Sequence, residues 1–226
     1  MDKLAVITGV GRGIGKATAQ KFLAEGWEVI GTYSKDKPDY THDKLQVHQL
    51  DITDDAAVRA FAQKVKALGR PVNVLVNNAG VLLDPEPEAN ADKIRRTFAV
   101  NVFGLVALTE QLLPLMSKGA HIVNISSRMG SFTTKPIEDT EATGYRMSKS
   151  ALNMYTRLLA YRTKTQGVTV SALHPGWVDT HMGNILATTD EGPDRTPQDA
   201  AEDIYKLAIS KPESGGFWFK GRPLGW

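Results

Sequence analysis

The chain lacks cysteine, and neither sign of charge dominates its composition. The absence of cysteine excludes disulfides, thiolate metal sites and a cysteine nucleophile. The 27 Lys and Arg residues against 25 Asp and Glu leave a formal net charge of +2, and no basic run is interleaved with aromatic residues. This composition argues against a nucleic-acid partner. The five histidines are scattered without ligand spacing, so we predict no metal site.

Hydrophobic runs are short throughout the sequence. The apolar stretch within residues 1–7 is too short for a signal peptide, and no later run approaches the roughly 20 apolar residues of a membrane span. We therefore expect no membrane partner and a cytoplasmic location. A length of 226 residues is enough for one well-buried domain but short for a second, substrate-binding domain. Residues 1–226 are predicted to form a single domain.

Short apolar segments alternate with longer amphipathic ones, which is typical of a parallel sheet covered by helices. The fold class predicted is α/β, a single-domain Rossmann-type doubly wound parallel sheet of about seven strands with helices on both faces. The segment Ser34–Leu45 is polar and contains Pro38, so it is expected to be a loop or a single turn. Strands are expected near 3–8, 27–32, 46–50, 72–77, 119–125, 168–173 and 216–220, and helices near 13–25, 54–68, 91–117, 143–166 and 197–210.

A glycine-rich turn follows the first predicted strand. Glycines at a strand-to-helix junction let backbone N–H groups approach a phosphate at the helix N-terminus. Taken alone, this turn is interpreted equally well as a plain strand-to-helix connection, because its Gly-x-x-x-Gly-x-Gly spacing differs from the commoner fingerprint. The turn contains Gly9, Gly11, Arg12, Gly13, Ile14 and Gly15.

A tyrosine and a lysine stand four residues apart on a predicted helix, at Tyr145 and Lys149. Residues at this spacing share one helix face. An ammonium about 5 Å from the phenol, at an effective dielectric of ~20, would lower the tyrosine pKa by roughly two units. Tyr145 could then exchange a proton with an alcohol or carbonyl. The pattern is common on amphipathic helices, so it needs support from other motifs.

Further motifs supply that support, and with them the sequence resembles the short-chain dehydrogenase/reductase family nearly end to end. The resemblance implies a nicotinamide-dependent oxidoreductase with a catalytic tetrad of Asn101, Ser127, Tyr145 and Lys149. The motifs, in family order, are the glycine turn, Asn77-Asn78-Ala79-Gly80, Val100-Asn101-Val102, Tyr145-x-x-x-Lys149 and Pro175-Gly176.

The resemblance implies a role for each tetrad member. The family places its catalytic serine three residues before a glycine, here Gly130, which selects Ser127 over Ser126. Ser127 would donate to the substrate oxygen, and Ser126 would serve strand-end hydrogen bonding. Lys149 would hold the nicotinamide ribose. Asn101 would bind, through its backbone, a water that relays protons from Lys149, or else mark a packing kink in a long helix.

The resemblance also implies a set of cofactor contacts. Asp51 would accept from the adenine amino group, although an N-terminal helix acid is a nearly equal alternative. The Asn77–Gly80 turn would steady the sheet beside the adenosine, and the segment 175–180 would face the nicotinamide carboxamide. Besides the glycine-turn residues, the expected contacts are Tyr33, Ser34, Lys35, Asp51, Ile52, Asn78, Ala79, Gly80, Tyr145, Lys149, Pro175, Gly176, Val178 and Thr180.

The choice of cofactor depends on the end of the second predicted strand. An acid there would bind a ribose 2′-hydroxyl and repel a 2′-phosphate. No acid occupies the expected position around Tyr33, while Arg12, Ser34 and Lys35 could hold a dianionic phosphate. We therefore predict that NADP(H) is preferred over NAD(H). The alternative is that Arg12 and Lys35 are ordinary surface charges.

The residues around the expected substrate site are mainly apolar and carry little fixed charge, so a small hydrophobic carbonyl or alcohol is the expected substrate. About half of them would only pack a loop. Ser127 and Tyr145 are 18 residues apart, and the polar stretch 133–140 between them is expected to overhang the cleft. The expected substrate contacts are Ser127, Met129, Phe132, Tyr145, Trp177 and Met182, with Ile185 and Leu186 beside them.

The sequence also resembles one branch of this family and leaves an alternative function open. Residues 174–178, His-Pro-Gly-Trp-Val, and the ending 214–226 resemble the branch that contains the C-signal factor and sniffer-type carbonyl reductases. The alternative to a reductase is an NADP-binding signalling protein with incidental turnover. An epimerase or dehydratase is disfavoured, since those relatives carry a further C-terminal substrate region.

A homodimer through the long helices is possible. Five residues would then lie in the interface, or would instead face the core: Leu105, Leu108, Leu112, Met154 and Leu158.

Overall fold

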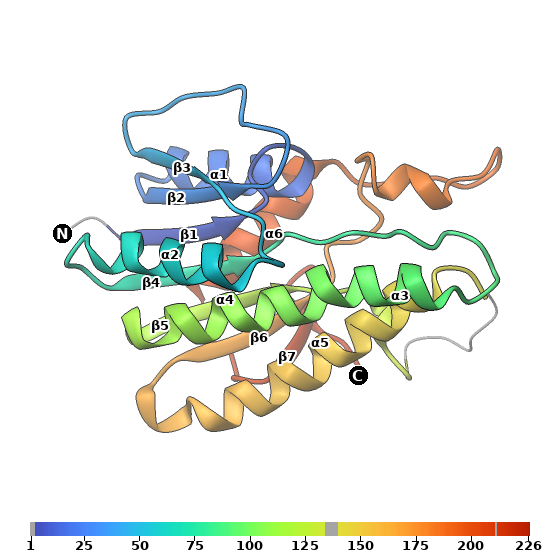
Figure 1. Ribbon diagram of the computed structural model, residues 1–226. Helices are drawn as coiled ribbons and strands as arrows, with labels where there is room; N and C mark the ends of the chain where they lie inside the picture. Colours follow the sequence, from blue (N-terminus) through green and yellow to red (C-terminus); the bar gives the residue numbers. More distant parts are fainter. Residues whose placement is uncertain (1–2, 134–139, 211) are drawn as a thin grey trace.

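The central strand β1 (Leu4–Thr8) is buried along its whole length, because it lies inside a parallel sheet that is covered on both faces. The computed structural model describes residues 3–133, 140–210 and 212–226. Its sheet has eight strands in the order β3-β2-β1-β4-β5-β6-β7-β8 (Figure 1). The other strands are β2 (Glu28–Tyr33), β3 (Leu45–Gln49), β4 (Val72–Asn77), β5 (Met116–Ile125), β6 (Thr169–Leu173), β7 (Gly216–Phe219) and β8 (Arg222–Pro223).

Alternate residues of β1 enter different layers of the core, as the period of a strand requires. Leu4 and Val6 pack with α2 (Asp55–Lys66), α4 (Leu105–Leu112) and α5 (Thr143–Arg162), which Figure 1 shows on the near face of the sheet. Ala5 and Ile7 pack on the opposite face with α1 (Gly13–Ala24) and α6 (Pro197–Ile209). The predicted doubly wound sheet with helices on both faces is therefore confirmed.

The strand order reverses between β1 and β4, which are neighbours on the two sides of a switch point. Ligands of such sheets bind in the crevice outside the carboxyl ends of the strands at this point. Residues 34–44 between β2 and β3 contain no helix, as Pro38 and the polar composition predicted. The crevice at the switch point therefore lies beside the glycine turn.

The sequence prediction of one helix over 91–117 is wrong in detail. The chain forms α3 (Ala91–Phe98), a π-helical segment η1 (Ala99–Gly104), α4 and a 3-10 turn (Leu113–Leu115). Pro114 ends the helical run because its ring and missing N–H cannot continue it. β5 consequently begins at Met116. The antiparallel strand β8, paired with β7, was also not predicted.

Three of the residues considered for a dimer interface belong to the core. Leu105, Leu108 and Leu112 are at most 3% exposed, whereas Met154 and Leu158 on α5 remain exposed. Contrary to the sequence prediction, the helical run Ala91–Leu115 is long and apolar enough, by length and composition, to cross a membrane. Helices that pack against a sheet can be equally long and apolar. The three buried leucines account for part of the apolar character of this run.

Candidate active site

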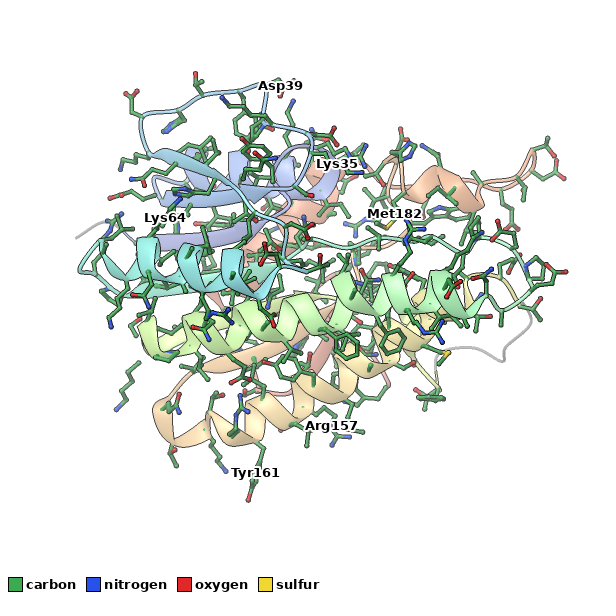
Figure 2. The ribbon with its side chains drawn as sticks, in the orientation of Figure 1. Lys35, Asp39, Lys64, Arg157, Tyr161 and Met182 are labelled. Atoms are coloured by element: carbon green, nitrogen blue, oxygen red, sulfur yellow. The ribbon has the colours of Figure 1, made fainter. Side chains whose placement is uncertain are left out.

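A cleft of about 1360 Å³ lies at the carboxyl ends of the strands. It is larger than the roughly 300–1,000 Å³ of an ordinary small-molecule site, so it has room for a dinucleotide and a second ligand. Lys35, from the segment after β2, and Met182, from the segment before α6, both line it (Figure 2). Every residue predicted to contact the cofactor lines this cleft, as do Ser127, Tyr145 and Lys149 of the predicted tetrad.

The glycine turn is shaped by close backbone contacts. A Cβ on Gly11 would lie 2.0 Å from the carbonyl oxygen of Asp36, and one on Gly15 would lie 2.1 Å from that of Gly9. Gly9 itself has φ +74, a conformation that favours glycine. Two positions of the turn therefore have no room for a side chain, and a third needs glycine for its backbone conformation.

The segment after β4 holds this turn in place. The hydroxyl oxygen of Thr8 accepts from the backbone N–H groups of Asn78 and Ala79, at 2.9 and 2.8 Å. The Asn78 amide donates to the Thr8 carbonyl at 2.8 Å. The Asn-Asn-Ala-Gly motif thus ties β4 to the turn after β1.

The start of α1 fits an anion. No described side chain caps this helix, and its first turn contains no acid. By contrast, the side chains of Asp54, Asn90 and Thr196 cap α2, α3 and α6. The first N–H groups of an α-helix have no partner within the helix and carry the positive end of its dipole. Those of α1 lie at the cleft and suit the pyrophosphate of a dinucleotide.

An acid that the sequence reading missed lies beside the predicted phosphate contacts. Asp36 lines the cleft, and its carboxylate is 3.3 Å from the Nε of Arg12. The loop after β2 brings it back over the glycine turn, although it follows Tyr33 by three residues. No acid stands at the expected position around Tyr33, and Tyr33, Ser34 and Lys35 line the cleft as expected, but Asp36 adds a carboxylate there that the sequence analysis did not consider.

Asp51 lies at the cleft and does not cap the following helix. One oxygen accepts from the backbone N–H and the hydroxyl of Thr53, at 2.9 and 2.7 Å. These hydrogen bonds, with a smaller contribution from Lys35, hold the pKa of Asp51 below its usual range. Because Asp54 caps α2, the helix-acid alternative for Asp51 is not supported.

Tyr145 and Lys149 lie together on α5 at the edge of the cleft. The Nζ of Lys149 is 5.4 Å from the centroid of the Tyr145 ring and donates to the Ile125 carbonyl at 2.8 Å. Burial lowers the pKa of Lys149 to about 8. Burial also raises the pKa of Tyr145 to about 12, against a smaller lowering effect of hydrogen bonding by Ser127. The sequence predicted a lowered tyrosine pKa; in this structure desolvation is the larger effect and raises it.

The distance of three residues between Ser127 and Gly130 has a packing reason. A Cβ on Gly130 would lie 2.6 Å from the backbone of Lys149 and Ser150 on α5. Without a side chain at Gly130, the turn after β5 packs directly on the helix that carries Tyr145. Ser127 is 7% exposed. Ser126 also lines the cleft, but it is 1% exposed and its hydroxyl donates to Asn153 at 2.5 Å, the structural role expected of it.

Asn101 lies within η1, behind the cleft, and is fully buried. Its amide exchanges two hydrogen bonds with the backbone of Val81, at 2.8 and 2.9 Å, and donates to the Ser148 hydroxyl at 3.0 Å. A Cβ on Gly80 would lie 3.3 Å from the Asn101 oxygen and 3.7 Å from the Lys149 Nζ. Asn101 thus fastens the segment after β4 to α5, next to Lys149.

A buried arginine supports the segment expected to face the nicotinamide, and sequence reasoning did not find it. Arg195 donates to the Pro175 carbonyl at 2.5 Å and to the Asp203 carboxylate of α6 at 2.7 Å. A Cβ on Gly176, which has φ +89, would lie 2.4 Å from the Cδ of Arg195. A lone arginine before the cap of α6 has no periodicity or motif that could have identified it.

The substrate end of the cleft is partly as predicted. Met129, Phe132, Trp177, Met182 and Leu186 line it, whereas Ile185 does not. It is also more polar than expected, because charged and polar residues line the cleft as well, among them Arg128, Arg146, Glu141 and His174. Burial, followed by the charges of Arg128 and Arg195, lowers the pKa of His174 to about 3, so this imidazole is neutral at physiological pH.

Comparison with known proteins places most of the chain in one family. The family model described as short chain dehydrogenase matches residues 3–191. An uncharacterized oxidoreductase of Bacillus subtilis, YxbG, is 34% identical over 203 residues, 84% of this chain and 72% of that protein. The C-signal protein of Myxococcus xanthus is 35% identical over 178 residues, 75% of this chain and all of that protein.

A solved structure extends the similarity over the whole fold. The crystal structure of an NADPH-bound carbonyl reductase from chicken fatty liver superposes with a TM-score of 0.90 and 28% identity. The match covers 100% of this chain and 94% of that one. The family match and this superposition therefore agree on the fold of the whole chain.

Proposed function

Since the chain belongs to the short-chain dehydrogenase family, we propose that it transfers a hydride between NADP(H) and a small hydrophobic carbonyl or alcohol. The observation that carries this proposal is the convergence of Ser127, Tyr145 and Lys149 on one cleft with an uncapped helix start beside the glycine turn. The similarity to a carbonyl reductase bound to NADPH supports it.

Tyr145 is the proton donor in this proposal. With a pKa raised to about 12, its phenol is protonated at neutral pH, which suits reduction of a carbonyl rather than oxidation of an alcohol. When bound, NADPH would supply the hydride. Ser127 donates a hydrogen bond to the substrate oxygen as negative charge develops there, and the Lys149 ammonium offsets the charge left on Tyr145.

The remaining residues bind the cofactor and return a proton to Tyr145. The N–H groups at the start of α1 bind the pyrophosphate, and Arg12, Ser34 and Lys35 bind the 2′-phosphate. Lys149 holds the nicotinamide ribose, and the segment 175–180 contacts the nicotinamide end. Asn101, through its backbone in η1, positions the water that returns a proton by way of Lys149.

A second candidate is an NADP-binding signalling protein whose turnover is incidental. The similarity to C-signal over the full length of that protein is the observation that favours it. The cleft offers a discriminating feature, because Ser127, Tyr145 and Lys149 are all present and all line it. A purely regulatory role requires the cofactor contacts, Lys149 among them, but not the hydroxyl groups of Ser127 and Tyr145.

The test is oxidation of NADPH, followed by its absorbance, against a panel of hydrophobic aldehydes, ketones and diketones. NADH and the variant Tyr145→Phe are run beside it, and cofactor binding is measured by fluorescence. Turnover with NADPH that disappears in Tyr145→Phe supports the reductase. Tight NADPH binding without reduction of any compound supports the signalling protein and overturns the proposed activity.

A further inference from the structure

Phe132 is an exposed aromatic side chain at the substrate end of the cleft. It is 82% exposed although it lines the cleft. Phenylalanine is among the residues most often buried, and because Phe132 lines the cleft its exposed ring offers an apolar contact surface to a ligand there. The position of Phe132 depends on the contacts that its neighbours in the chain make.

Both neighbours of Phe132 are tied to the C-terminal tail, residues 224–226. The Ser131 hydroxyl donates to the Gly225 carbonyl at 3.1 Å, and the Thr133 hydroxyl donates to the Trp226 carbonyl at 2.8 Å. These contacts join segments more than 90 residues apart in the sequence. The tail thus holds the residues on either side of Phe132.

The tail is itself anchored on the body of the fold. The ring of Trp226 stacks on Phe217 of β7, with centroids 5.3 Å apart and planes inclined by 17°. The guanidinium of Arg157 on α5 lies 5.8 Å from the Trp226 ring, and the Leu224 N–H donates to the Phe217 carbonyl at 2.7 Å. Figure 1 shows the C-terminus beside α5 and β7, and Figure 2 marks Arg157 on that helix.

The fit between tail and loop is tight. A Cβ on Gly225 would lie 2.2 Å from the hydroxyl oxygen of Thr133. At its other end the same loop is fastened to α5, where the Ser150 hydroxyl donates to the Gly130 carbonyl at 2.9 Å. The stretch from Gly130 to Thr133 therefore has an anchor at each end, with Phe132 between them.

We propose that the tail 224–226 sets substrate specificity by holding Phe132 as an apolar wall for carbonyl compounds whose body is large enough to cover its ring. Thr133 and Trp226 are positioning residues, since they act through Phe132. This inference rests on the proposed reductase activity. A small aldehyde reaches Ser127 and Tyr145 without needing the wall, whereas an aromatic aldehyde gains affinity by stacking on it.

The experiment compares benzaldehyde with propionaldehyde in Trp226→Ala and Thr133→Val. We expect KM for benzaldehyde to rise about tenfold, the factor for one apolar contact of this size, while kcat for either compound and KM for propionaldehyde keep their wild-type values. Trp226→Phe retains the stacking on Phe217 and should restore KM. Tyr161→Ala is the matched control, because Tyr161 is 85% exposed and lies outside the lining of the cleft.

A second readout follows the loop without catalysis. Chymotrypsin cuts after phenylalanine, so the rate of cleavage between Phe132 and Thr133, followed by mass spectrometry, reports how firmly the tail holds the loop. We expect faster cleavage at this bond in Trp226→Ala and Thr133→Val, and the wild-type rate in Trp226→Phe and Tyr161→Ala. Melting temperatures measured in parallel separate loop release from global unfolding.

The outcomes separate the two proposals. A wild-type protein that reduces neither aldehyde overturns the proposed reductase activity. Reduction of both aldehydes with equal sensitivity to Trp226→Ala, or cleavage at Phe132 that does not change in either variant, overturns the role of the tail.

Discussion

The guanidinium of Arg12 and the carboxylate of Asp36 form an ion pair at the end of the cleft beside the glycine turn, with Nε and Oδ2 3.3 Å apart. Both side chains are more than half exposed, so the pair is weak and can open. Arg12, which is expected to bind a 2′-phosphate, is thus already paired with Asp36, whose negative charge would repel that phosphate. We therefore expect selectivity between NADPH and NADH to depend on the balance between these two charges.

Replacing Asp36 with asparagine should strengthen NADPH binding. The change removes a repulsive charge and frees Arg12, and since exposed pairs contribute little we expect Kd for NADPH to fall by about threefold with Kd for NADH unchanged. Fluorescence titration at low and high salt measures both. Asp39→Asn is the control, because Asp39 lies in the same loop, paired with Lys16 at 2.6 Å, and does not line the cleft. Equal changes for both cofactors would contradict the role of Asp36.

Arg12→Ala should have the opposite effect. Loss of the guanidinium removes a charge-assisted contact to the 2′-phosphate but nothing that NADH uses, so Kd should rise about tenfold or more for NADPH and little for NADH. The same titration measures it. Losses of equal size with the two cofactors would mean that Arg12 does not contact the 2′-phosphate.

Tyr145→Phe should separate binding from chemistry. Removing a general acid costs about 10²–10⁴ in rate, and the ring that packs beside Lys149 remains. We expect kcat to fall by roughly that factor while Kd for NADPH stays at the wild-type value. Single-turnover absorbance and fluorescence titration give the two numbers. Residual turnover near the wild-type level would contradict the assignment of Tyr145.

Carbonyl reduction should lose activity as the pH rises through about 8. Burial lowers the pKa of Lys149 to about 8, so its ammonium is present below this pH and is lost above it. Tyr145, with a pKa of about 12, remains protonated across the same range. A plot of log kcat/KM against pH should bend downward near pH 8. In Lys149→Arg, whatever activity remains should show no bend there, because arginine stays charged. A wild-type profile that is flat up to pH 9.5 would rule out this explanation.

Asp203→Asn should weaken both the fold and cofactor binding. It leaves the Arg195 guanidinium, which is 8% exposed, without its carboxylate. Breaking such a buried pair from one side costs about 3 kcal/mol of unfolding free energy, and Arg195, which donates to the Pro175 carbonyl, loses the carboxylate that orients it. Denaturant unfolding and Kd for NADPH measure the two effects. The double variant Arg195→Met with Asp203→Leu should regain stability but not affinity; recovery of both would show that Arg195 does not position the segment 175–180.

Much of the site could be predicted from the sequence, because the features concerned depend on residues close together in the chain. The glycine turn after β1 follows from backbone conformation and close contacts over a few residues. Tyr145 and Lys149 share a helix face because they are four residues apart. The period of the strands and helices, with Pro38 in the second crossover, predicted the doubly wound sheet and the loop after β2. Each of these depends on neighbours within one or two turns of chain.

Tertiary structure decided the features that depend on burial and on contacts between distant segments. The charge of Lys149 predicted a lowered pKa for Tyr145, but the depth of the cleft raises it, because desolvation is a property of everything packed around the group. Leu108 could have faced a partner or the core, and packing against the sheet buried it. Asp36 meets Arg12 only through the path of a loop. Phe132 acquires its supports from a tail more than 90 residues away, a distance across which no sequence period operates.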